Sequence, residues 1–184
     1  YNSGKVIEVT GVGYEPKGEF HGSGPFDPKS DKDLSLLLTI GALCNNASLQ
    51  NDNGIWRIMG DPTEGALIVA AAKADFEHTE LEKQCPRIGE IPFTSERKRM
   101  TTIHQTSEGE QIAFMKGAPE IVLERCMRIL ENGKEKKLTD AKRKEILETN
   151  EKLASEALRM LGMAYKKLSD TLKQFDEETV ENGL

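Results

Sequence analysis

The sequence lacks long hydrophobic runs and any recognisable secretion signal. No run approaches the roughly 18 apolar residues of a membrane-spanning helix, and the longest apolar stretches, 34–43 and 66–72, suit buried helices. The chain opens Tyr1-Asn2-Ser3-Gly4, without an initiator methionine and without the apolar stretch of a signal peptide. We therefore expect a soluble piece cut from a larger protein.

Cysteine is scarce. The three cysteines, Cys44, Cys85 and Cys126, are far apart and form no CxxC pair. Zinc sites and redox dithiols need paired cysteines, so we expect reduced thiols of a cytosolic protein and no metal site. The three histidines adjoin no Cys or carboxylate motif, and we interpret them as surface or packing residues: His21, His78 and His104.

The common nucleotide and catalytic signatures are also missing. There is no phosphate loop, because Gly133-Lys134 is followed by Glu135 instead of Ser or Thr. GxGxxG, HExxH and a nucleophile elbow are absent, which disfavours a self-contained ATP-using enzyme. With 25 Lys and Arg against 31 Asp and Glu, the net charge of −6 argues against a nucleic-acid coat.

What the sequence does contain is typical of one globular domain spanning residues 1–184. Alternation and apolar periodicity predict strands at 5–10, 55–59, 88–93, 100–106, 111–116 and 159–168. Helices are predicted at 31–44 with Ser30 or Asp31 as the N-cap, at 62–74 after Asp61, at 119–130, and at 139–158 with Thr139 as the N-cap. The last helix is expected to have an apolar face formed by Ile146, Leu147, Leu153, Ala157 and Leu158. Loop with short extended pieces is expected at 11–28, turns at 45–54 and 131–134, and an acidic tail compatible with a helix at 169–184. This order favours an α+β fold, a mainly antiparallel β-sheet flanked by helices, over a doubly wound fold.

Four short stretches carry more information together than singly. They are Asp-Pro-Thr-Glu at 61–64, Pro-Phe-Thr-Ser-Glu-Arg-Lys-Arg-Met at 92–100, Lys-Gly-Ala-Pro-Glu at 116–120 and Leu-Arg-Met-Leu at 158–161. In this order and at these separations the chain resembles the nucleotide-binding (N) domain of cation-transporting P-type ATPases, closest to the calcium-pump branch. The resemblance covers the chain from about Val6 to its end.

The resemblance implies an adenine pocket. Phe93 would stack on the base, although the residues alone favour a core phenylalanine. Lys116 would line the back of the pocket. Its residue type and position alone suggest instead a solvated lysine at the end of a strand. Gly117 and Ala118 would let the ligand approach the backbone, and Leu161 would pack against the base or the pocket floor.

Glu64 has two interpretations. It lies three residues after Asp61, the spacing of a capping box at a helix start that has Pro62 in its first turn. In the family the matching glutamate accepts a hydrogen bond from the adenine amino group, which would favour adenine over guanine. Both interpretations stay open here.

The resemblance also implies phosphate contacts. Arg159 would reach the phosphates, against the alternative of a solvated cation at a helix end. Lys98 best matches the family's lysine within the basic triplet 97–99, which otherwise reads as a solvated face. Where the calcium-pump motif commonly has an arginine, this chain has Ser95. That contact is therefore missing or supplied by Arg97.

The function implied is ATP binding, with Mg²⁺ carried on the phosphates and the γ-phosphate presented to an aspartate of the phosphorylation domain. That aspartate becomes an aspartyl phosphate and lies outside this chain, so we expect no catalytic residue here and no hydrolysis by the fragment. The implied partners are the phosphorylation and actuator domains of the same pump, on the cytoplasmic side of a membrane, with the fragment a monomer. The alternative is a protein-interaction module that uses the charged helix 139–158.

Overall fold

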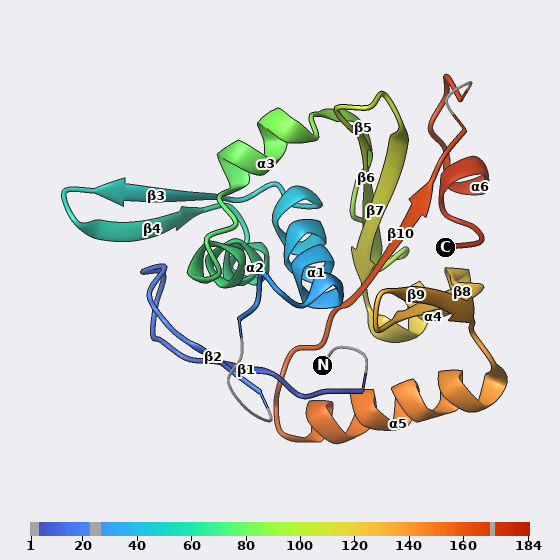
Figure 1. The fold of residues 1–184 in the computed structure, drawn as a ribbon, viewed down its shortest axis with the longest axis horizontal. Helices are drawn as coiled ribbons and strands as arrows, with labels where there is room; N and C mark the ends of the chain where they lie inside the picture. The colour runs from blue at the N-terminus through green and yellow to red at the C-terminus, as the bar shows by residue number, and fades with distance from the viewer. Residues whose placement is uncertain (1–3, 23–26, 170–171) are drawn as a thin grey trace. The chain divides into compact units, whose positions relative to one another are not determined.

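The computed structural model describes residues 4–22, 27–169 and 172–184. Their contacts form two compact units, one of residues 1–84 with 131–133 and one of residues 85–130 with 134–184. Within the described ranges no helix combines the length and the apolar content needed to span a bilayer. The predicted α+β class is confirmed, with antiparallel sheets and helices in each unit (Figure 1). The expectation of a single domain at 1–184 stays a prediction.

The first unit is a helical layer with two small hairpins. It contains β1 (Glu8–Val9), β2 (Phe20–His21), α1 (Lys32–Leu43), β3 (Ser48–Asp52), β4 (Ile55–Met59), α2 (Pro62–Lys73) and α3 (His78–Gln84). Apolar residues of α1 and α2, with Phe20, form its buried core. The N-caps follow the sequence: Asp31 accepts backbone hydrogen bonds at the start of α1, and Asp61 does so at the start of α2.

Three features of this unit differ from the prediction. The strand expected at 5–10 is confined to β1, Glu8–Val9. Residues 45–54 were expected to be a turn region, but β3 pairs with β4 around an Asn53-Gly54 turn, with φ of 52° and 88°. Asn-Gly tolerates positive φ at both turn positions, so it is the strongest short signal for a hairpin. Helix α3 was not predicted, and none of its residues is buried.

The second unit is built on a four-stranded antiparallel sheet in the order β10-β7-β6-β5. Its strands are β5 (Arg87–Ile91), β6 (Arg99–Gln105), β7 (Gln111–Gly117) and β10 (Gly162–Lys167). The predicted hairpin across 107–110 is confirmed by the β6–β7 register, in which Gln105 faces Gln111. Strand β10 is shorter than the predicted strand at 159–168. It begins at Gly162, so residues 159–161 precede it, and it ends at Lys167.

One face of this sheet is covered from within the unit. Side chains alternate across a strand, and the register puts Met115, Ala113, Ala164 and Ile103 on the same face. Val122 of α4 (Pro119–Arg125) and Leu184 pack on one part of it, and Val180 of α6 (Glu177–Val180) on another. The C-terminal segment is therefore part of the core of this unit.

The rest of the unit is more exposed. Helix α4 ends at Arg125, not at the predicted residue 130, and β8 (Arg128–Glu131) pairs with β9 (Lys134–Lys137) around a second Asn-Gly turn. Thr139 caps α5 (Asp140–Ser155), as predicted. No residue of α5 is buried, although Ile146, Leu147 and Leu153 of its expected apolar face are half-buried. The other two residues expected on that face, Ala157 and Leu158, lie beyond the end of α5 and are exposed. The Arg143 guanidinium bonds to the carbonyls of Leu123 and Cys126 and so ties α5 to the end of α4.

Candidate functional site

All the predicted site residues except Glu64 belong to the second unit. In the antiparallel order β10-β7-β6-β5, the end of β5, the start of β6, the end of β7 and the start of β10 meet at one end of the sheet. The residues at this end are Phe93, Lys98, Lys116, Gly117 and Ala118, with Leu161 directly before β10 and Arg159 two residues earlier. Segments about 70 residues apart in sequence thus converge there.

Phe93 lies on the loop of residues 92–98, which joins β5 to β6. Its side chain is 58% exposed, so the alternative of a core phenylalanine is wrong. The loop closes on itself, because the Lys98 amide donates to the Thr94 carbonyl at 2.8 Å and the Arg97 amide donates to Thr94 Oγ1 at 3.2 Å. A large aromatic ring is therefore presented on an ordered loop at the sheet end.

Lys116 is the opposite case, a charged residue that is only 6% exposed. In the sheet register it lies between Met100 of β6 and Met163 of β10. Paired residues share a face, so two methionine side chains flank the lysine stem. The interpretation of Lys116 as a solvated strand end is wrong.

Gly117 is explained by the neighbouring strand. A Cβ atom on Gly117 would lie 2.5 Å from the Lys98 carbonyl oxygen and 2.8 Å from Arg99 Cα. Both of these are backbone atoms, so a larger residue would push β6 and β7 apart. The next amide, that of Ala118, donates to the same Lys98 carbonyl at 2.9 Å. Lys98, Gly117 and Ala118 are thus joined through the backbone.

The remaining predicted residues lie on the segment between α5 and β10. Arg159 is exposed and Leu161 is half-buried. The neighbour of Leu161, Gly162, faces Gly117 across the β10–β7 register. Leu161, one residue before Gly162, therefore lies next to Ala118 at the end of the sheet. Arg159 lies two residues further back on the same segment.

The basic triplet 97–99 divides in two. Lys98 is exposed, with a φ of 51°. Arg97 and Arg99 instead bind two carboxylates of the C-terminal segment, Glu177 and Glu181. Arg99 Nε lies 2.7 Å from Glu181 and its Nη2 lies 2.9 Å from Glu177, while Arg97 pairs with both carboxylates. The interpretation of the whole triplet as a solvated face is therefore wrong.

Glu181, like Glu177, is a residue of this cluster that sequence reasoning missed. Its carboxylate is fully buried and also accepts a hydrogen bond from Thr101 Oγ1 at 2.7 Å. Burial alone would raise its pKa, but the hydrogen bonds from Arg97, Thr101 and Arg99 outweigh burial and hold the pKa below its usual value. The only signal in the sequence was an acidic tail in a chain that also has a basic triplet.

Glu64 lies in the first unit, at the third position of α2. Its amide donates to Asp61 Oδ1 at 3.4 Å, and its carboxylate accepts a hydrogen bond from the Asn46 amide at 3.3 Å. The local structure thus supports a structural role at the start of α2. Its role as an adenine ligand stays a prediction.

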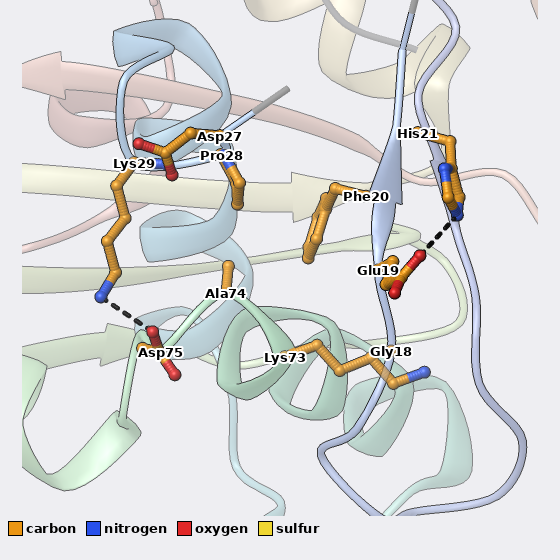
Figure 2. A pocket seen from close by; sticks show the side chains of 10 residues that line it. All are labelled: Gly18, Glu19, Phe20, His21, Asp27, Pro28, Lys29, Lys73, Ala74 and Asp75. Atoms are coloured by element: carbon orange, nitrogen blue, oxygen red, sulfur yellow. Dashed lines mark hydrogen bonds and ion pairs between the residues drawn. The ribbon is translucent and has the colours of Figure 1, made fainter. Parts of the chain in front are cut away.

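A separate pocket of about 440 Å³ opens in the first unit (Figure 2). None of the predicted site residues lines it. Lys29 pairs with Asp75 at its rim at 3.0 Å, and Lys73 donates to the Thr10 carbonyl at 2.7 Å. The two lysines that line this pocket therefore already interact with other residues of this protein.

Known proteins resemble this chain over most or all of its length. The family model described as "P-type ATPase, cytoplasmic domain N" matches residues 33–184 and so spans parts of both units. A calcium-transporting ATPase of Bacillus subtilis is 34% identical over 189 aligned residues, covering 100% of this chain. A cation-transporting ATPase, pma1, of Synechocystis is 38% identical, again over the whole chain.

A calcium-transporting ATPase 1 of Bacillus cereus is 41% identical over 77% of this chain. The matched part of the chain spans only a minor share of these relatives, 21% of the Bacillus subtilis protein and 15% of the Bacillus cereus protein.

Proposed function

Because the chain belongs to the family of P-type ATPase cytoplasmic N domains, we propose that it binds ATP at the end of the four-stranded sheet in its second unit. The observation that carries the proposal is the convergence there of an exposed aromatic ring, a buried lysine and two exposed cations. These are Phe93, Lys116, Lys98 and Arg159.

The adenine ring is held by Phe93 and the lysine. An exposed aromatic ring on an ordered loop can stack on a base, an interaction worth about 1–3 kcal/mol. The aliphatic stem of Lys116 is flanked by Met100 and Met163 in the sheet register and offers apolar surface to the edge of the adenine ring. Its charged ammonium group at the tip can contact polar groups or solvent. Leu161 packs beside the base, and Gly117 and Ala118 complete this wall.

The phosphates meet Lys98 and Arg159. Both residues are exposed, so a polyphosphate can reach them from solvent. A guanidinium can grip phosphate oxygens in a bidentate way, and an ammonium attracts them as a point charge. Magnesium enters bound to the phosphates.

In the parent protein the domain positions ATP, and the chemistry happens elsewhere. The γ-phosphate projects towards an aspartate of the phosphorylation domain, which becomes an aspartyl phosphate. The role of this chain is to hold the phosphoryl group in reach, so the fragment binds nucleotide and does not hydrolyse it. We propose calcium as the ion transported by the parent protein, because several relatives are named calcium-transporting ATPases; ion selectivity itself lies in membrane helices outside this chain.

An ATP titration of the chain followed by amide chemical shifts tests the proposal. We expect saturation with a Kd on the order of 0.1–1 mM, because only one wall of the site is present. The shifts should map to Phe93, Lys116, Gly117 and Arg159, and GTP should bind more weakly than ATP. No shift with either nucleotide at several millimolar would contradict ATP binding and favour a protein-interaction role for α5.

A further inference from the structure

Arg97 ties together the two ends of the loop that carries Phe93. Its Nη1 donates to the carbonyl of Pro92 at 2.6 Å, and its own amide is bound to Thr94 Oγ1. The Pro92 carbonyl belongs to the peptide unit that leads into Phe93. The guanidinium therefore fixes the backbone next to the exposed ring.

The same guanidinium is anchored on the C-terminal segment. It bonds to Glu181 Oε1, and its Nε lies 3.0 Å from Glu177 Oε1. Glu181 is in turn held by Arg99 at 2.7 Å and Thr101 at 2.7 Å, both on β6. Two guanidinium groups thus face two carboxylates, and the cluster is neutral as a whole. Its most buried member, Glu181, is 0% exposed.

We propose that Arg97 and Glu181 are positioning residues for the nucleotide: together they lock the 92–98 loop so that Phe93 is presented to the base. The inference rests on the proposed ATP site. Arg97 is then no substitute for the arginine that Ser95 replaces, because its donors already face Pro92, Glu177 and Glu181. The C-terminal helix α6 becomes part of the binding apparatus without touching the ligand.

A comparison of two ligands separates positioning from phosphate binding. A residue that acts through Phe93 must affect adenosine and ATP alike, whereas a phosphate ligand affects only ATP. We expect Arg97→Gln to weaken both ligands by about tenfold, which corresponds to about 1.4 kcal/mol of lost stacking. Lys98→Gln, one residue away, should weaken ATP and leave adenosine unchanged. If Arg97→Gln weakened ATP alone, or neither ligand, the proposal would be wrong.

Glu181→Gln tests the anchor from the other side of the cluster. It should weaken adenosine and ATP by a similar factor to Arg97→Gln, and the double variant should lose little more than either single one. Glu178→Gln, on the exposed face of the same short helix, is the matched control and should change nothing. Val180→Ala removes buried packing from α6 while keeping the carboxylates. An equal loss of affinity in Val180→Ala would reduce the role of Glu181 to general stability and overturn the proposal.

Amide spectra of the free chain keep the inference testable apart from ATP binding. In Arg97→Gln the signals of residues 93–98 should shift and broaden, while those of Ala113 and Ile103 in the middle of the sheet stay in place. If the unmodified chain bound no nucleotide, the proposed function would fail, and these spectra would still decide whether Arg97 holds the loop. Unchanged loop signals would overturn the positioning role. If Arg97→Gln did not fold, the amide signals of residues 93–98 would be compared between the unmodified chain and Glu181→Gln, with the same outcomes deciding the positioning role.

Discussion

Two charged segments of the second unit look alike in sequence and differ in structure. The basic triplet 97–99 and helix α5 are both rich in Lys and Arg, and each suggested either a solvated face or a functional one. On α5 the charges pair along the helix in water, as Lys144 does with Glu148 at 3.7 Å, with side chains 79% and 64% exposed. In the triplet, Arg99 is 5% exposed and is bound to carboxylates about 80 residues away in the sequence.

The difference shows that the burial and the partner of a charged side chain decide how much it contributes to stability. A surface ion pair gains little because water screens it and both side chains lose freedom. A buried pair is different, since removing one partner leaves an uncompensated charge away from water. Arg97 and Arg99 should therefore be sensitive to substitution, and the exposed pairs of α5 should tolerate it.

The largest effect is expected at Arg99. Arg99→Met leaves the buried Glu181 carboxylate with one guanidinium fewer, and we expect the free energy of unfolding to fall by about 3 kcal/mol. Urea unfolding measures it. A loss below about 1 kcal/mol would show that Arg97 and Thr101 suffice to neutralise Glu181, and the contrast with α5 would weaken.

Phe93→Ala comes next, with an effect on binding and not on folding. The ring is 58% exposed, so the free energy of unfolding should change by less than about 0.5 kcal/mol. The affinity for ATP should fall by about 1–3 kcal/mol, because base stacking is lost. Chemical-shift titration and urea unfolding of the same variant check both halves. A large loss of stability would place the ring in the core after all.

The third test uses acid. The pKa of Glu181 is lowered on folding, so its contribution to stability is complete above the usual value of 4.5 and is lost as the pH falls through the folded value. The difference in unfolding free energy between the unmodified chain and Glu181→Gln should therefore shrink below pH 4.5. A difference that stayed constant down to acid unfolding would contradict the ionic role of Glu181.

The smallest effect is expected on α5. Lys144→Ala removes an exposed pair and should change the free energy of unfolding by less than about 0.5 kcal/mol. The affinity for ATP should stay the same. A measurable loss of ATP affinity would link α5 to the nucleotide site and break the contrast between the two segments.

Local signals predicted much of the fold. Caps at Asp31, Asp61 and Thr139 depend on contacts within three residues, so the sequence alone places these helix starts. The hairpin of β6 and β7 follows from alternation around a short turn. The turn predicted at 131–134 is confirmed, but the strands on either side of it were not predicted. The error at 45–54 has a local cause, since the Asn-Gly pair at 53–54 is a hairpin signal that was interpreted only as a turn.

The sequence by itself therefore determined the helix starts, the β6–β7 hairpin and, through four motifs, the family. Only the tertiary structure decided that Phe93 is exposed, that Lys116 is buried and that Gly117 lies against the Lys98 carbonyl. It also decided that Arg97 and Arg99 are paired while Lys98 is not part of their cluster. These properties depend on strand register and on partners some 80 residues away, and no local pattern encodes which distant carboxylate a guanidinium will meet.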